Sequence, residues 1–120
     1  MSEYAILLPG DEDAWAQSSA EQREAVYAVH REFMRRLEER GHVVTGGAEL
    51  AHRRHTRVVN RAADGGVVVT DGPYAEGAEQ LTGFYLVRTD DVEDLLQLAG
   101  LLAGEDGPVE VRPTTSGDPS

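Results

Sequence analysis

The chain has 120 residues, of which 40% are hydrophobic and 28% are charged, a balance typical of one globular domain. It has no cysteine, which excludes disulfides, thiolate metal ligands and a cysteine nucleophile. The net charge of -11 argues against nucleic-acid binding, which depends on basic groups that neutralise phosphates. The sequence has no apolar run long enough to span a membrane and no basic start of a signal peptide. We therefore expect a cytoplasmic protein that binds neither membranes nor nucleic acid.

The first third of the chain predicts a strand, a polar loop and a long helix. The strand covers residues 3–8 and the loop residues 11–17. Ser18 or Ser19 opens the helix, because each has a glutamate or glutamine three positions further on, the spacing of a capping box. The helix ends near Arg40, before a glycine. Four apolar residues share one face at helical spacing: Val26, Val29, Phe33 and Leu37.

The rest of the chain predicts five strands and one helix. The strands cover residues 43–50, 56–62, 66–70, 81–88 and 109–112. Asp64 and Gly65 favour a hairpin between the second and third of these strands. Asp90 caps the helix, with Glu93 three residues on. The order β-α-β-β-β-β-α-β is that of a ferredoxin-like α+β domain with an added hairpin.

Both helices should cover one face of the sheet, because βαβ crossovers are right-handed. We place the domain at residues 1–113 and a flexible C-terminal tail at residues 114–120, where proline, serine, threonine and glycine accumulate.

The predicted strands are apolar on both faces of the sheet. Phe84 and Leu86 point one way, Tyr85 and Val87 point the other way, and residues 67–69 are three consecutive valines. Two helices bury only one face, and monomers rarely expose a large contiguous apolar patch. We therefore expect a homodimer in which the second face packs on its copy. The alternative is that loops cover this face.

Residues 69–87 read VTDGPYAEGAEQLTGFYLV, which resembles the signature of the YCII-related proteins in the branch called DGPF. That branch reads DGPF, then A-E, then E-Q-L-G-G; here Tyr74 replaces the phenylalanine and Thr82 the first glycine. The resemblance extends over nearly the whole chain, since residues 10–15 and 111–113 also fit the family. It implies a dimeric α+β barrel with a His–Asp pair as its active site. Many DGPF members accompany extracytoplasmic-function sigma factors in their genomes.

His30 and Asp71 are the candidate catalytic residues. His30 lies within the apolar helical stripe, so its ring should face the sheet or a cleft, where a group that titrates near neutrality serves as a general acid or base. The alternative is a core histidine bonded to backbone. Asp71 ends an apolar strand, where it could orient the imidazole or take its proton. Alternatively, it only stabilises the Asp-Gly-Pro turn.

Five further residues are candidates for ligand binding: Trp15, Tyr74, Glu76, Glu79 and Arg112. The tryptophan is either a pocket wall or a lid over the sheet edge, and the tyrosine either lines the pocket or packs ordinarily. The two glutamates either contact the pocket or face solvent. The arginine either holds an anionic ligand or pairs with an acidic residue across the dimer.

Two classes of function remain open from the sequence. The first is an enzyme without metal or cofactor that carries out lyase, isomerase or cyclase chemistry on a small molecule. The second is a non-catalytic module that binds a small ligand or a protein such as a sigma factor. We expect no zinc site, because His52 and His55 have no carboxylate at a fitting spacing.

Overall fold

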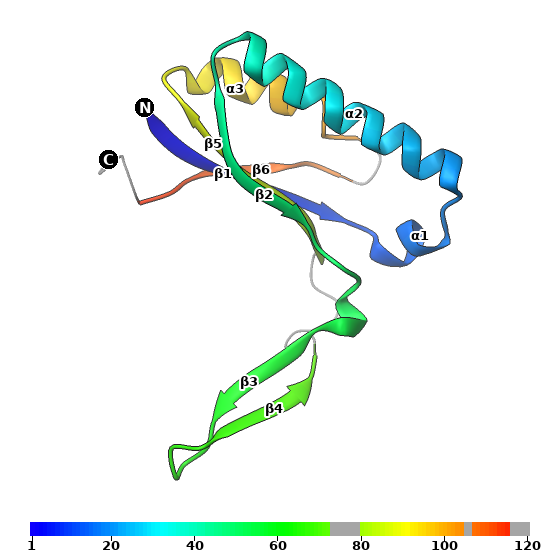
Figure 1. The fold of residues 1–120 in the computed structure, drawn as a ribbon, viewed down its shortest axis with the longest axis vertical. Coiled ribbons are helices and arrows are strands. Elements are labelled where there is room, and N and C mark those ends of the chain that lie inside the picture. The colour runs from blue at the N-terminus through cyan, green and yellow to red at the C-terminus, as the bar shows by residue number, and fades with distance from the viewer. Residues whose placement is uncertain (73–79, 105–106, 116–120) are drawn as a thin grey trace.

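The computed structural model describes residues 1–72, 80–104 and 107–115. The body of the molecule is a four-stranded antiparallel sheet in the order β2-β5-β1-β6 (Figure 1). Its strands are β1 (Ser2–Gly10), β2 (Val43–Glu49), β5 (Gln80–Thr89) and β6 (Glu110–Pro113). The helices are α1 (Glu12–Gln17), α2 (Ala20–Glu39) and α3 (Val92–Ala99), and a short 3-10 turn, η1, covers Arg53–His55. The predicted α+β fold is thereby confirmed.

One face of the sheet carries the hydrophobic core. Ile6 of β1 and Val87 of β5 lie on this face, and both are fully buried. The two longer helices pack against it through side chains that share one cluster with these two residues: Phe33 and Leu37 of α2, and Leu95 and Leu98 of α3. Both helices therefore cover the same face, as the right-handed crossovers predict.

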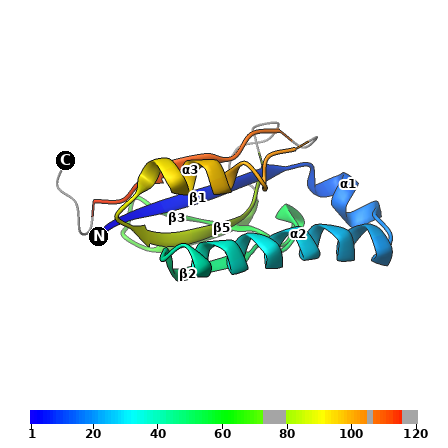
Figure 2. The same ribbon diagram turned by 90° about the horizontal axis from the view of Figure 1, so that it is seen from above.

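The N-terminal half of α2 extends past the end of β5 (Figure 2). This overhang explains a difference from the sequence analysis. Phe33 and Leu37 are buried as expected, whereas Val26 and Val29 remain about two-fifths exposed, at 41% and 42%. Helical periodicity identified the correct stripe but not the length of sheet available to cover it.

The opposite face of the sheet has no covering helix among the described elements. Side chains alternate along a strand, so Phe84 and Leu86 point away from the helices, and Ala5 and Leu7 join them from β1. Phe84, Leu86 and Leu7 are only half-buried. The molecule measures 51 × 42 × 19 Å.

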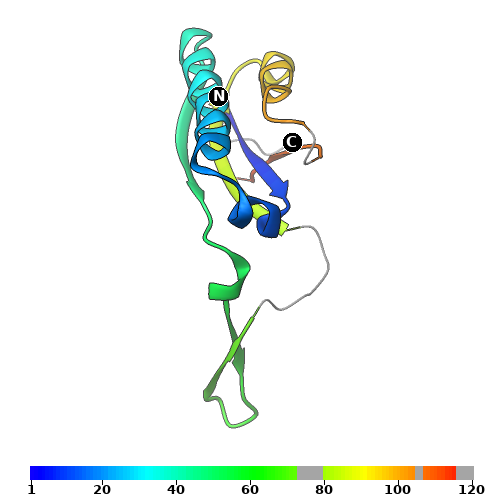
Figure 3. The ribbon, with the colours of Figure 1, turned by 90° about the vertical axis from the view of Figure 1, so that its right-hand side faces the viewer.

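The hairpin predicted at Asp64 and Gly65 is confirmed, but it stands apart from the sheet. Strands β3 (Arg57–Arg61) and β4 (Val67–Asp71) form a separate two-stranded ribbon that projects from the body (Figure 3). Gly65 has a φ of 89°, a left-handed conformation that favours glycine. The expectation that the three valines at residues 67–69 belong to the two-faced main sheet was wrong, because β4 pairs only with β3.

The helix starts agree with the sequence only in part. Ser19 and Gln22 form the expected capping box of α2. Residues 11–17 are not a loop, because Asp11 caps the short helix α1 by accepting from the amide of Ala14 at 3.0 Å. A single helical turn carries no readable apolar stripe. The residue that caps α3 is Asp91 rather than Asp90.

The C-terminal end of the described structure lies against β1. Thr114 donates its backbone N–H to the carbonyl oxygen of Glu3 at 3.0 Å. Residues 116–120 of the predicted tail lie outside the described residues. No helix in the described ranges is both long and apolar enough to cross a membrane.

A buried histidine ties α2, β5 and α3 together. His42 is 6% exposed, and its Nδ1 lies 2.7 Å from the Thr89 hydroxyl while its Nε2 lies 2.7 Å from a carboxylate oxygen of Asp94. Arg40 donates to the same carboxylate at 2.8 Å. Hydrogen bonds from Arg40 and His42 lower the pKa of Asp94 to about 2. Both ring nitrogens are satisfied and Thr89 is buried, so this network holds the fold together.

We expect His42→Ala to lower the free energy of unfolding by about 2–3 kcal/mol, because it removes the two hydrogen bonds that the buried imidazole makes with the Thr89 hydroxyl and with Asp94. Chemical denaturation monitored by circular dichroism measures this change. His55→Ala is the control: His55 is exposed, and its loss should cost less than about 0.5 kcal/mol. Equal effects of the two variants would show that the network is not stabilising.

Candidate active site

The candidate site is built around His30 of α2 and Tyr85 of β5. Nδ1 of His30 lies 2.6 Å from the Tyr85 hydroxyl oxygen, and both side chains are half-buried. The two rings are stacked, with centroids 5.8 Å apart. Phe33, one turn further along α2, also packs against Tyr85, and the centroids of these two rings are 5.4 Å apart. The pair therefore sits at the edge of the core, held by apolar neighbours and bonded to each other.

A glycine on the neighbouring strand makes room for this pair. Gly47 of β2 lies opposite Tyr85, just after a register shift in the β2–β5 ladder. A Cβ at this position would lie 2.6 Å from the carbonyl oxygen of Phe84 and 3.3 Å from Cδ1 of the Tyr85 ring. The φ of Gly47 is also positive, at 148°. Only glycine fits both requirements, so Gly47 permits the Tyr85 ring to reach His30.

Burial keeps both members of the pair neutral. Desolvation lowers the pKa of His30, and the negative charge of Glu49 partly opposes this effect. Desolvation likewise raises the pKa of the Tyr85 hydroxyl. A neutral imidazole and a neutral phenol form a hydrogen bond in either direction, depending on the imidazole tautomer. The pair can therefore donate or accept a proton near neutral pH.

A second polar pair lies one helical turn before His30. The Tyr27 hydroxyl donates to both carboxylate oxygens of Glu49, which ends β2, at 3.0 Å each. Desolvation and, after it, the Glu49 carboxylate raise the pKa of Tyr27. Trp15 of α1 meets the Tyr27 ring edge-to-face, with centroids 5.6 Å apart. Residues three apart on a helix are neighbours on its surface, so these groups continue the site outward from His30.

Arg23 holds Trp15 in this position. Its guanidinium donates to the backbone carbonyl oxygens of Trp15 and Ala16, each at 3.0 Å. The same guanidinium lies 5.5 Å from the centre of the Trp15 ring, a cation–π contact. Trp15 is half-buried between these contacts and Tyr27. These contacts fix Trp15 next to Tyr27, and its role as a pocket wall or a lid stays a prediction.

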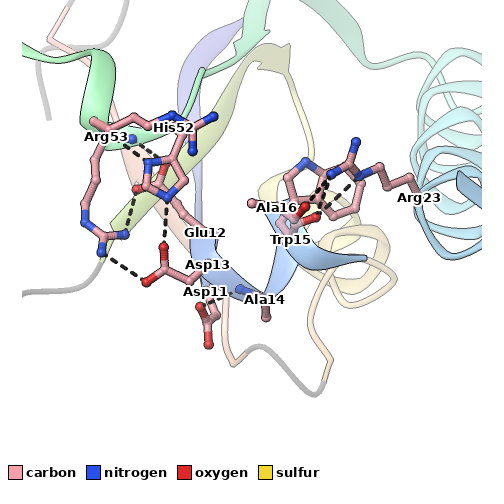
Figure 4. Close-up of polar contacts among 10 residues, drawn as sticks. Asp11, Glu12, Asp13, Ala14, Trp15, Ala16, Arg23, His52 and Arg53 are labelled. Atoms are coloured by element: carbon pink, nitrogen blue, oxygen red, sulfur yellow. Dashed lines mark hydrogen bonds and ion pairs between the residues drawn. The ribbon is translucent and has the colours of Figure 1, made fainter. Parts of the chain in front are cut away.

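Ion pairs anchor the short helix α1 to η1 (Figure 4). Nε2 of His52 lies 2.9 Å from Asp13, and Arg53 donates to the same carboxylate at 3.1 Å. The buried carboxylate of Glu12 accepts from the backbone N–H of Arg53 at 3.0 Å. The hydrogen bond to His52 is the main cause that lowers the pKa of Asp13, followed by the bond to Arg53. Because α1 carries Trp15, these contacts fix one border of the candidate site.

Asp71 is not near His30 within one chain. It ends β4, in the projecting ribbon, and lies opposite Arg57 of β3. It is exposed. His30 instead has Tyr85 as its partner, and no carboxylate among the described residues bonds to it.

The other predicted ligand residues fall in different places. Arg112 of β6 lies opposite Ala5, so it projects from the uncovered face of the sheet rather than toward His30. Tyr74, Glu76 and Glu79 lie outside the described residues. Within the part of the chain that the structure describes, no group of three or more histidine, cysteine or acidic side chains is placed to hold a metal ion.

Three residues of the site were missed from the sequence: Tyr27, Glu49 and Tyr85. The sequence analysis placed Tyr85 on the same face of its strand as Val87, which is correct, but gave it no role in the site. The signal that could have identified it is the Gly46–Gly47 pair in the neighbouring strand, since a glycine inside a strand often marks the close approach of another group. Glu49 and Tyr27 had no local signal, because their contact spans 22 residues of sequence.

The fold and this site define an α+β domain with a His–Tyr pair at the edge of its core. A family model of the YCII-related domain matches residues 2–115. An uncharacterised protein of Rhizobium meliloti (strain 1021) is 31% identical over 121 residues, a match that covers 92% of this chain and 90% of that protein. The chain therefore belongs to the YCII-related family, as the DGPY segment at residues 71–74 indicated.

Desolvation lowers the pKa of His30 and the charge of Glu49 raises it, so a substitution at Glu49 tests this balance. Glu49→Gln removes the negative charge that favours the imidazolium, so we expect the pKa of His30 to fall further below its ordinary value. Two-dimensional NMR of the histidine ring protons over pH 4–9 measures this pKa. Glu38→Gln, an exposed change of equal charge on the same helix, should leave it unaltered. A rise in the His30 pKa on Glu49→Gln would contradict the assigned electrostatics.

Proposed function

We propose that this protein is a cofactor-independent enzyme that moves protons on a small organic molecule, with His30 as the general acid or base. The observation that supports this most is the 2.6 Å contact between His30 Nδ1 and the Tyr85 hydroxyl at a half-buried position. A histidine kept only for the fold would be expected to be buried with both ring nitrogens bonded, as His42 is. His30 is instead half-buried, and its Nδ1 partner can itself exchange a proton.

The chemistry follows from the two nitrogens of the imidazole. Nδ1 is occupied by Tyr85, whereas Nε2 has no hydrogen-bond partner in residues 1–72, 80–104 and 107–115. When Nε2 takes a proton from a substrate carbon or oxygen, Nδ1 keeps its own proton and donates a hydrogen bond to the Tyr85 oxygen, which stabilises the imidazolium until Nε2 returns the proton to the substrate. Metal-independent lyase, isomerase and cyclase reactions use such a transfer. Trp15 and Tyr27 would form an aromatic border for the substrate.

We also propose that the active form is a homodimer that packs through the uncovered face of the sheet. Phe84, Leu86 and Leu7 occupy that face, and Arg112 lies beside them on β6. Covering this apolar surface with a second copy follows the isologous arrangement that most homodimers adopt. Asp71 lies away from His30 in its own chain, so in this proposal it contributes only if a second chain brings it near.

A second candidate function is a non-catalytic binding module, for example one linked to a sigma factor. The projecting ribbon favours it, because Val59 and Val67 are 64% and 65% exposed there. In that case His30 would have no role in turnover and the ribbon would carry the function. The two proposals differ in the effect of changing His30.

The enzyme proposal is tested by a thermal-shift screen of a metabolite library against the wild type, His30→Gln and Tyr85→Phe. We expect a compound that raises the melting temperature of the wild type and fails to do so for His30→Gln. If that compound is turned over, removal of the imidazole should slow the reaction roughly 10²- to 10⁴-fold, the usual contribution of a general acid or base.

His55→Ala is the matched control, since it removes a histidine that is exposed. It should bind and turn over like the wild type. A ligand that His30→Gln binds and converts at the wild-type rate would overturn the proposal and leave the binding module as the better account.

A further inference from the structure

We propose that the β3–β4 ribbon is a docking arm whose valine face, formed by Val59, Val67 and Val69, packs on a second copy of this chain. The inference rests on the homodimer proposed above and is independent of the acid–base chemistry at His30. It assigns a role to the one described part of the chain that packs least against the body.

Strand register separates the two faces of the ribbon. Residues directly opposite each other in an antiparallel pair lie on the same face. One face therefore contains two cross-strand pairs, Val59 with Val69 and Arg61 with Val67, and at its base Arg57 with Asp71. The other face contains Asn60 with Val68 and Val58 with Thr70. Three valines thus gather on one side, with an arginine at each end.

The three valines of that face are each more than half exposed. Val59, Val67 and Val69 are 64%, 65% and 52% exposed. A two-stranded hairpin is at best marginally stable in water unless another element covers it. In the described chain, β3 and β4 pair with each other and join no larger sheet. The apolar face therefore requires a partner surface.

Charge identifies the second copy as that partner. Residues 52–61 hold four of the 11 arginines and two histidines but no acidic residue, so the rest of the chain sets seven arginines against all 22 acidic residues. Arg57 and Arg61 of this basic stretch border the valine face. Another copy of this acidic chain offers acidic groups for the arginines as well as apolar surface for the valines. A polyanion offers only the acidic groups, and a basic partner offers no complementary charge.

The shape of the molecule permits this contact. The ribbon projects beyond the body (Figures 1 and 3). When two bodies pack through their uncovered sheet faces, a ribbon that extends past its own sheet can lie against the other chain. In a two-fold dimer the contact is made twice, once by each ribbon.

The absence of cysteine makes the contact directly testable. Val59→Cys places a single thiol on the valine face, and a maleimide–benzophenone probe attached there cross-links its neighbours on illumination. The experiment uses an equal mixture of ¹⁴N- and ¹⁵N-labelled protein. We expect cross-linked peptides of mixed label, which arise only between two chains. The same probe at Asn60→Cys, on the opposite face, should give few of them.

Sedimentation velocity over a concentration series supplies the second measurement. We expect Val59→Asp to raise the dissociation constant of the dimer roughly tenfold or more, because it places a charge in an apolar contact. Asn60→Asp adds the same charge on the other face and should change the constant less than about threefold. Circular dichroism confirms that both variants are folded.

The possible failures are distinguishable. A wild type that is monomeric at every concentration overturns both the homodimer and the docking arm. Suppose instead that the wild type is a stable dimer, that Val59→Asp weakens it no more than Asn60→Asp does, and that every cross-linked peptide carries a single label. This result overturns the docking arm alone. Neither result affects the test of His30, which measures ligand binding and turnover.

Discussion

The structure depends on one constraint: two helices cover only one face of a four-stranded sheet. Phe33 and Leu37 of α2, with Leu95 and Leu98 of α3, bury Ile6 and Val87 on that face. The opposite face retains Phe84 and Leu86 without a helix over them. Everything proposed about assembly follows from this imbalance, because exposed apolar surface of this kind is rarely left without a partner.

The same packing creates the candidate site. The overhang of α2 places His30 where the core ends, so the imidazole is half-buried rather than enclosed. Gly47 removes the side chain that would block the Tyr85 ring, and Tyr85 then reaches Nδ1 of His30. Desolvation from the nearby core keeps the imidazole neutral while Glu49 limits how far its pKa falls. The half-buried His30–Tyr85 pair at the core edge therefore depends on one glycine and on the length of one helix.

The sequence predicted the order of the strands and of the two longer helices, the capping box at Ser19 and the hairpin at Gly65, because the signals for each are residues close together in the chain. It also indicated the family from the segment around Asp71. It did not predict that Tyr85 bonds to His30 across 55 residues, since such contacts depend on helix overhang and strand register. The exposure of Val26 and the separate ribbon were missed for the same reason: periodicity identifies a face but not what covers it.

Two histidines show how context decides a role. His42 has both ring nitrogens bonded and is buried, so it serves the fold. Among the described residues His30 has one nitrogen bonded, and it lies at the core edge, an arrangement that fits the proposed acid–base role. Sequence alone ranked His30 first because of its apolar helical surroundings, and the structure supplies Tyr85 in place of the carboxylate that was expected to accompany it.

The central claim is that His30 is a neutral imidazole whose Nδ1 is bonded to Tyr85. Long-range ¹H–¹⁵N NMR of the histidine rings at pH 7 tests it most directly, in the wild type and in Tyr85→Phe. We expect a neutral ring in the wild type and a shift of the Nδ1 resonance in the variant, with Nε2 changing much less. A fully protonated ring, or spectra of His30 that do not change in Tyr85→Phe, would contradict the account.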